Sequence, residues 1–457
     1  MPAPVSLPDP LRPEFAADLE AFPDAPRYLI QIAVDETATR LSGHQEVRYV
    51  NAEEAPLTDL YLRLFPNTPG YGGAMTVTHL LVGGVPVTAS EELEGSALRL
   101  PLDPPLAVGQ AITLTMDFSV AVPTDNRAGY AQFSVIRGVT ALPNAYPLIP
   151  AYDDEGWNVE VAPEYGDAVY SDIALFAVQV TAPPELTLIA SGSCQQRAEG
   201  DWVCLAGPMR DFALFLGREY RSASKTVDGV VVNSYYYPEN ESGGLAALEQ
   251  AADAVAFYSD TFGPYPYTEL DVVETPTEAG GIEYPGLVVI GDFFYGHGDP
   301  SYTEWVIAHE VAHQWWYALV GNDQVDEPWL DEALAQYSAL LYFETQHGAE
   351  MADNILQSWF VETYNQVVER GQDMPVNLPV AAYVESGRYS DIVYSKGPLY
   401  FHALRQAVGD EAFFDILRTY YEHNRYGVAT AEDWLEAVET VSGDRQQAIF
   451  DKWIAGG

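Results

Sequence analysis

The chain has 457 residues, enough for two or three domains, and 48% hydrophobic against 19% charged residues excludes a disordered protein. Acidic residues number 67 against 21 basic ones, and the formal net charge of −46 argues against nucleic acid or anionic membranes as partners. No apolar run approaches the roughly 20 residues of a membrane span. The acidic surface fits either a general solubility bias or adaptation to high salt, where screening relieves self-repulsion.

The N-terminal residues Met1–Pro26 are rich in proline, alanine and acidic side chains. They lack the basic start and apolar centre of a signal peptide. The protein is therefore either cytoplasmic or has had its signal peptide removed from this sequence.

The first half predicts β structure. Short stretches rich in β-branched and aromatic residues alternate with polar positions and are separated by turn residues, with no long helical pattern before about Gly243. We expect a large antiparallel β domain, sandwich-like or saddle-like. The clearest predicted strands are Tyr28–Val34, Glu46–Asn51, Asp59–Leu64, Ile112–Phe118 and Ala174–Val180.

The two cysteines, Cys194 and Cys204, flank the likely turn Glu199–Gly200. If Ser191–Arg197 and Asp201–Leu205 pair as a hairpin, the two thiols face each other across it. A disulfide there would indicate an oxidising, extracytoplasmic location. The alternative is two free thiols.

The pattern changes near residue 220, which predicts a β domain at 1–220 and a second domain at 221–457. After the change, helical spacing of apolar residues dominates, interrupted by two short strands. The predicted elements are a helix at Leu245–Thr261, strands at Leu270–Glu274 and Leu287–Ile290, and mostly helices after Ser301.

A metal-binding pattern lies in His309-Glu-Val-Ala-His313. Ser301 and Glu304 form a possible capping box for a helix in which His309 and His313, four residues apart, project from one face. Two imidazole nitrogens at this spacing can reach one zinc ion. Glu310 lies between them and is well placed to take a proton from metal-activated water.

A third ligand follows 18 residues after His313, at Glu332. Asp326 and Pro328 supply start signals for a second helix that carries it as an antiparallel neighbour. Two histidines and one glutamate leave a fourth position for water, as a catalytic zinc site requires. We therefore expect one Zn²⁺ ion and a hydrolase.

Together His309, Glu310, His313 and Glu332 resemble the zinc signature of peptidase family M1, the gluzincin aminopeptidases. Gln314-Trp-Trp316 and Trp329-Leu330 strengthen the resemblance, whereas the family's Asn-Glu-Gly around the third ligand is replaced by Asp331-Glu-Ala333. The resemblance implies a thermolysin-like, mainly helical catalytic domain after the β domain, in an α+β multidomain protein. The sequence stops soon after Trp453, so we expect a compact form without the family's helical C-terminal domain, and a more open cleft.

The segment Gly280-Gly281-Ile282-Glu283-Tyr284 resembles the family's Gly-x-Met-Glu-Asn motif, with Ile and Tyr in place of Met and Asn. By that resemblance Glu283 binds the α-amine of the substrate, while Gly280, Gly281 and Ile282 lie along an extended peptide. A carboxylate that holds the charged amine fixes the register, so only the first peptide bond reaches the zinc.

Tyr394 lies in a Tyr-x-Lys-Gly context similar to that of the family's catalytic tyrosine, whose phenol donates to the oxyanion. Tyr389 lies close by in the sequence and could line the same pocket.

These residues predict a zinc-dependent aminopeptidase acting on peptides with a free N-terminus. One alternative is a zinc endopeptidase with an open cleft, and another is a non-catalytic binding protein on the same fold. The preferred N-terminal residue, the biological substrate and the oligomeric state do not follow from the sequence.

Overall fold

The computed structural model describes residues 9–124 and 128–456. Within them the chain forms two compact units that interleave along the sequence. The predicted boundary near residue 220 stays a prediction, because segments of the two units alternate along the chain and do not test a single boundary between two domains. The first unit comprises the described parts of Met1–Val161, Ser171–Leu248 and Pro266–Gly298, and the second comprises Ala162–Tyr170, Glu249–Tyr265 and the described part of Asp299–Gly457.

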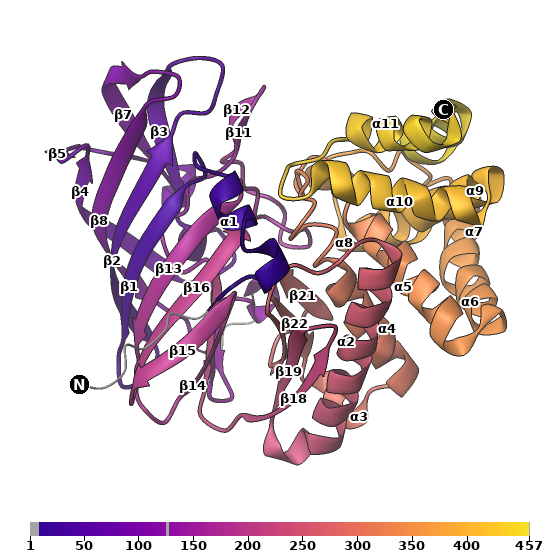
Figure 1. Ribbon diagram of the computed structural model, residues 1–457, viewed down its shortest axis with the longest axis horizontal. Coiled ribbons are helices and arrows are strands. Elements are labelled where there is room, and N and C mark those ends of the chain that lie inside the picture. The colour runs from indigo at the N-terminus through magenta and orange to yellow at the C-terminus, as the bar shows by residue number, and fades with distance from the viewer. Residues whose placement is uncertain (1–8, 125–127, 457) are drawn as a thin grey trace. The chain divides into compact units, whose positions relative to one another are not determined.

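An eight-stranded sheet dominates the first unit, with strand order β15-β16-β13-β1-β2-β8-β4-β5 (Figure 1). Buried residues alternate with exposed ones along β1 and with half-buried ones along β13, so one face packs against the core. The strands are β1 (Arg27–Val34), β2 (Arg40–Val50), β4 (Ala74–Val82), β5 (Val85–Pro86), β8 (Ala111–Ala121), β13 (Ala174–Thr181), β15 (Ser193–Ala198) and β16 (Asp201–Met209).

This sheet differs from the predicted antiparallel one at a single pair of strands, because β1 and β13 run parallel. Parallel neighbours need a long connection between them, and the chain from β2 to β12 supplies it. The other strand pairs of this sheet are antiparallel.

Smaller sheets complete the first unit. Their strand orders are β3-β7-β6, β14-β17-β10-β9, β11-β12 and β18-β19-β20-β22-β21. The strands are β3 (Leu57–Arg63), β6 (Ser90–Glu92), β7 (Ala97–Leu106), β9 (Ser134–Ile136), β10 (Val139–Pro143), β11 (Tyr152–Asp153), β12 (Gly156–Trp157), β14 (Thr187–Ala190), β17 (Ala213–Gly217), β18 (Arg221–Val227), β19 (Val230–Tyr236), β20 (Glu269–Thr275), β21 (Gly281–Tyr284) and β22 (Leu287–Gly291).

The four-stranded and five-stranded sheets share one hydrophobic core. Phe215 of β17 and Ile189 of β14 pack with Val273 of β20 and Leu287 of β22. The short helices α1 (Asp18–Ala21) and α3 (Phe293–His297) also belong to this unit.

The hairpin predicted around the cysteines is formed by β15 and β16, which pair Cys194 with Cys204. A disulfide joins the two residues.

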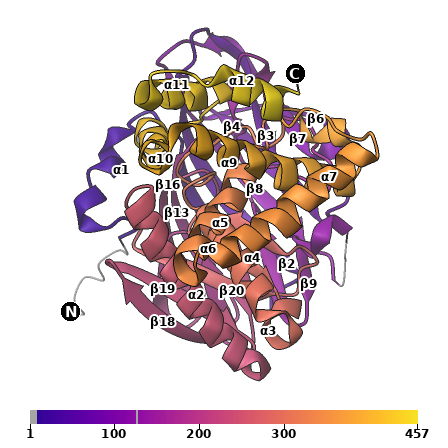
Figure 2. The same ribbon diagram turned by 90° about the vertical axis from the view of Figure 1, so that its right-hand side faces the viewer.

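The second unit is mainly helical (Figure 2). Buried aromatic side chains form its centre, among them Trp329, Tyr337, Phe401 and Trp434. Its helices are α4 (Pro300–Ala312), α5 (Glu332–His347), α6 (Ala349–Ile355), α7 (Glu362–Glu369), α8 (Ser386–Tyr389), α9 (Gly397–Val408), α10 (Asp410–Asn424), α11 (Ala431–Ser442) and α12 (Gln447–Phe450), with π-helical segments η6 (Leu356–Val361), η8 (Ser390–Lys396) and η9 (Asp451–Ala455).

Helix α2 (Glu241–Thr261) begins in the first unit and ends in the second. None of the helices in the described residues combines the length and apolarity needed to cross a bilayer.

Candidate zinc site

Helix α4 carries two of the predicted ligands. It begins at Pro300, and the Asp299 side chain accepts a hydrogen bond from the Ser301 amide at 2.9 Å. The predicted Ser301/Glu304 capping box is therefore wrong: Asp299 is the cap, because a proline fits the first helical position without needing its amide. Glu304 instead accepts hydrogen bonds from Tyr342 Oη at 3.1 Å and from His347 Nε2 at 2.9 Å.

Tryptophans after the helix fix its C-terminal end. The Trp315 indole donates to the Gly263 carbonyl at 2.8 Å, and the Trp316 indole donates to Ser338 Oγ of α5 at 3.0 Å. Both side chains are fully buried. The histidines of α4 are thereby held on a rigid element, which a metal site requires.

Helix α5 supplies the third predicted ligand from its first position. Asp331 caps the helix by accepting from the Glu332 amide at 2.8 Å, and its other oxygen accepts from Gln324 Nε2 at 2.8 Å. The predicted helix start at Asp326 and Pro328 is therefore too early. Glu332 is the first helical residue, so its backbone is fixed by the cap.

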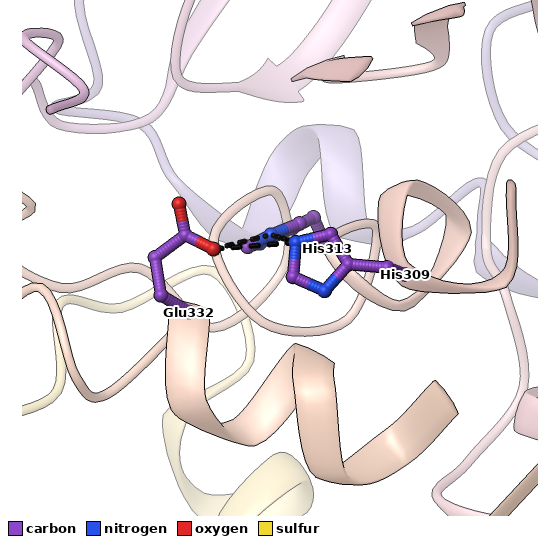
Figure 3. A group of neighbouring side chains, drawn as sticks. All are labelled: His309, His313 and Glu332. Carbon is purple, nitrogen blue, oxygen red and sulfur yellow. Dashed lines mark hydrogen bonds and ion pairs between the residues drawn. The ribbon is translucent and has the colours of Figure 1, made fainter. Parts of the chain in front are cut away.

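His309, His313 and Glu332 converge on one point (Figure 3). His309 Nε2 lies 3.1 Å from His313 Nε2, and each of these nitrogens lies 3.3 Å from Glu332 Oε2. All three side chains are buried, with at most 8% of each residue exposed.

This triangle fits a zinc ion. Bonds of 2.0–2.1 Å in a tetrahedral site place neighbouring ligand atoms about 3.3–3.4 Å apart, close to the three edges of the triangle. Glu332 Oε2 has no hydrogen-bond donor among the described residues, although it is buried. A buried carboxylate oxygen without a donor and two imidazole nitrogens aimed at each other are stabilised together by a cation.

Hydrogen bonds and charge favour the protonation states in which these side chains can bind a metal. His313 Nδ1 donates to the Trp316 carbonyl at 3.0 Å, which leaves Nε2 free to bind a metal. Burial lowers the pKa of His309 below its usual value. Burial also raises the pKa of Glu332, but the charge of His313 and the proximity of both imidazoles outweigh it, so this pKa lies well below its usual range. At neutral pH Glu332 is ionised and His309 is neutral.

Tyr394 reaches the same site from the π-helical segment η8. Its phenol donates a hydrogen bond to Glu332 Oε1, and its ring lies 6.0 Å from the His309 ring. Burial raises the pKa of Tyr394 well above 10, and the charge of Glu332 raises it further. The hydroxyl therefore stays protonated and can donate. Tyr389 is buried with its ring 5.7 Å from that of Tyr394.

Glu310 is buried on α4 between the two histidines, with 5% exposure. The amine-binding candidates belong to the other compact unit. Glu283 lies there on β21, the edge strand of the five-stranded sheet, and is 7% exposed. Gly281 and Ile282 share that strand, and Gly280, just before it, accepts a hydrogen bond from the Gly291 amide. The roles of these residues remain predictions.

The departure from Asn-Glu-Gly at Ala333 has a structural counterpart. Ala333 is fully buried at the start of α5, and a Cβ on Gly397 would lie 2.5 Å from the Ala333 Cβ. Gly397 begins α9 directly after the segment that carries Tyr394. Glycine at position 397 lets the segment that carries Tyr394 approach helix α5, which carries Glu332.

Sequence reasoning missed three contributors to the site. Asp331 was noted only as a departure from the family pattern, and Gln324, which holds it, was not singled out. Tyr165 lies far upstream, yet its ring contacts that of Tyr389 at 5.7 Å. No local motif marks these residues, although an aspartate directly before a helical glutamate is itself a capping signal.

Much of this chain is similar to known proteins. Residues 246–453 match the Peptidase family M1 domain. Aminopeptidase N of Lactococcus lactis subsp. lactis (strain IL1403) is 28% identical over 258 residues, which are 53% of this chain and 30% of that protein. The match thus spans under a third of that relative's length.

Solved structures show the same fold. A mutant M1 zinc metallopeptidase from Deinococcus radiodurans bound to a Tyr-Ser-Ala substrate superposes with a TM-score of 0.68 at 19% identity, covering 95% of this chain and 94% of that one. A two-domain M1 zinc metallopeptidase mutant bound to L-tryptophan gives a TM-score of 0.67 at 20% identity, covering 94% of both chains. The predicted combination of a β domain with a mainly helical catalytic domain is confirmed.

Proposed function

We propose that this chain is a zinc-dependent aminopeptidase of peptidase family M1 that removes the N-terminal residue from peptides, because residues 246–453 match the domain of that family. The observation that carries the proposal is the buried triangle of His309, His313 and Glu332, whose edges of 3.1–3.3 Å suit one zinc ion with an open fourth position. A curated relative is an aminopeptidase, and a structural neighbour binds a tripeptide.

The chemistry divides among few side chains. Zinc held by the three ligands supplies a Lewis acid and lowers the pKa of water. Glu310, a buried carboxylate that lies between the two histidines in the sequence, takes a proton from the attacking water and returns it to the leaving amine. Tyr394, protonated at neutral pH, donates a hydrogen bond from its hydroxyl to the oxyanion that develops on the scissile carbonyl.

Glu283 makes the enzyme an exopeptidase in this proposal. Its carboxylate sits on an edge strand, where an extended peptide can add alongside, and pairs with the charged α-amine. The amine then sets the distance from the N-terminus to the bond that is cut.

The test compares one peptide with a free N-terminus and the same peptide N-acetylated, with and without a zinc chelator. We expect chelator-sensitive cleavage of the free peptide only, and Glu283→Gln should abolish this preference while zinc content stays at one ion per chain. Equal cleavage of both peptides by the wild-type protein would mean an endopeptidase. A protein that contains no zinc by elemental analysis would point to the non-catalytic alternative.

We also propose an extracytoplasmic location, supported by the Cys194–Cys204 disulfide of the β15–β16 hairpin. The test is alkylation of the protein taken directly from its native source, followed by mass spectrometry. Two alkylated thiols without prior reduction would contradict the proposal.

A further inference from the structure

The π-helical segment η8, which carries Tyr394, ends in a buried lysine. Lys396 follows Tyr394 by two residues and is 1% exposed. Its ammonium donates to Asp373 Oδ1 at 2.7 Å and to the Met374 carbonyl at 2.7 Å. The chain has three lysines, and a lysine is seldom buried unless it is paired. Lys396 thus joins η8 to a separate stretch of chain.

The stretch that Lys396 binds is itself fixed from outside. The second carboxylate oxygen of Asp373 accepts a hydrogen bond from Tyr364 Oη of α7 at 3.0 Å. Three residues further on, the amide of the buried Val376 donates to the Ile454 carbonyl at 2.7 Å. The lysine is therefore bonded to a part of the chain that other elements hold in place.

The same stretch also supports Tyr394 through its neighbours. The Val376 carbonyl accepts a hydrogen bond from Tyr383 Oη at 2.7 Å. The Tyr383 ring lies 5.4 Å from the Tyr389 ring, which in turn lies 5.7 Å from the Tyr394 ring. One stretch of chain thus supports η8 through the lysine and Tyr394 through two buried tyrosines.

The backbone of η8 gives this support a purpose. Between α8 and α9 the Gly397 amide donates to the Ile392 carbonyl, five residues earlier, which is the hydrogen bond of a π-helix. Such turns are rare and occur mostly as single bulges within α-helices, often at functional sites. The buried bonds of Lys396 hold the end of this turn.

We propose that Lys396 is a positioning residue, which places the Tyr394 hydroxyl through its bonds to Asp373 and the Met374 carbonyl. This inference rests on the proposed aminopeptidase function, in which Tyr394 donates to the oxyanion. Stability alone does not account for the lysine, because apolar side chains often replace a buried ion pair at no cost. A donor to an oxyanion, in contrast, needs one fixed place, since a displacement of about 1 Å can cost about 100-fold in rate.

The experiment introduces Lys396→Met into the zinc-loaded wild-type protein and into Tyr394→Phe, with alanyl aminomethylcoumarin as the substrate. Methionine is a flexible apolar side chain that fills the space without the charge. If Lys396 acts through the Tyr394 hydroxyl, its replacement matters only while that hydroxyl is present. Lys452→Met is the matched control, because it removes the same charge from an exposed position in η9.

We expect Lys396→Met to lower kcat by about 10- to 100-fold and to change KM less than about threefold, because the affected interaction forms in the transition state. In Tyr394→Phe the same substitution should change kcat by less than about twofold. Lys452→Met should keep kcat in both proteins, and zinc should stay at one ion per chain throughout. In crystal structures, the Tyr394 hydroxyl of Lys396→Met should lie about 1 Å or more from its place in the wild-type protein.

An equal loss of kcat with and without the Tyr394 hydroxyl would overturn the proposal, because Lys396 would then only support the fold. Unchanged kcat in Lys396→Met, or an unmoved hydroxyl, would overturn it too. If Lys396→Met does not fold, Asp373→Asn takes its place in the same comparison, since the Asp373 side chain is 40% exposed and tolerates replacement. Failure of the aminopeptidase function itself would appear separately, as no cleavage of the alanyl compound by the wild-type protein.

Discussion

Replacement of Tyr394 by phenylalanine removes one hydroxyl and leaves the ring contacts in place. The ring lies 5.7 Å from that of Tyr389 and 6.0 Å from that of His309, and phenylalanine preserves both contacts. The substitution removes a hydrogen-bond donor. In the structure the Tyr394 hydroxyl donates to Glu332 Oε1, and in the proposed reaction it donates to the oxyanion instead. The substitution therefore separates the chemistry of the hydroxyl from the packing of the side chain.

The size of the effect follows from the surroundings of this donor. Loss of one donor to an oxyanion costs about 100- to 1000-fold in kcat, or about 2.7–4 kcal/mol. Burial and the charge of Glu332 raise the pKa of Tyr394 well above 10, so the hydroxyl remains a donor at every pH at which the enzyme is assayed. We expect kcat to fall by this factor from pH 6 to pH 9, with KM changed less than about threefold.

The assay measures kcat and KM on a good aminoacyl-coumarin substrate, together with zinc content and melting temperature. Zinc should stay at one ion per chain, because the phenol is not among the three ligands. The control is Tyr383→Phe, in the same cluster of buried tyrosines, whose hydroxyl donates to the Val376 carbonyl at 2.7 Å. This control should lose about 1–3 kcal/mol of stability, since it leaves a buried carbonyl unpaired, and should keep kcat.

A loss in kcat below about fivefold for Tyr394→Phe would refute the reasoning. So would a loss that disappears when the zinc content is restored, because the tyrosine would then act on the metal and not on the oxyanion.

Three further predictions concern the same unit. Glu310→Gln should keep its zinc and lose at least about 1000-fold in kcat, because the amide cannot accept the proton from water; near-normal turnover would contradict the role of Glu310. Gly397→Ala should lower the free energy of unfolding by about 1–2 kcal/mol, because the new Cβ lies 2.5 Å from that of Ala333. The control Gly387→Ala, with nothing within 4 Å of its Cβ, should change the free energy of unfolding little. Equal denaturation midpoints for the two variants would count against a steric clash at Gly397. Because burial lowers the pKa of His309, this ligand stays unprotonated as the pH falls through 6.5, and the protein should retain zinc at pH 6. Equilibrium dialysis measures the zinc content, and zinc release with a midpoint above pH 6.5 would contradict the lowered pKa.

The sequence by itself determined the metal chemistry. His309 and His313 are four residues apart on a helix, and the helical period alone places both imidazoles on one face. The strands from Tyr28 onward and the cysteine hairpin were also predictable, because alternation and turn residues are local signals. Such features depend on neighbours within a few residues.

Helix ends were predicted less well. The cap of α4 is Asp299 and that of α5 is Asp331, whereas the sequence offered Ser301 and Asp326. Each candidate has a side chain that can accept a hydrogen bond from a helical amide, so propensity does not choose between them. The choice depends on where the rest of the chain holds the backbone, as Gln324 does by bonding to Asp331.

Only the tertiary structure decided which distant residues meet at the zinc site. The edges of 3.1–3.3 Å among the ligand atoms require Glu332 to return to the helix of the histidines, and spacing along the chain cannot give such a distance. The approach of Tyr394 depends on a close contact between Gly397 and Ala333. Tyr165 lies more than 140 residues before His309, and no period or motif connects them. Its ring packs against that of Tyr389, because folding buries aromatic surface irrespective of separation in sequence.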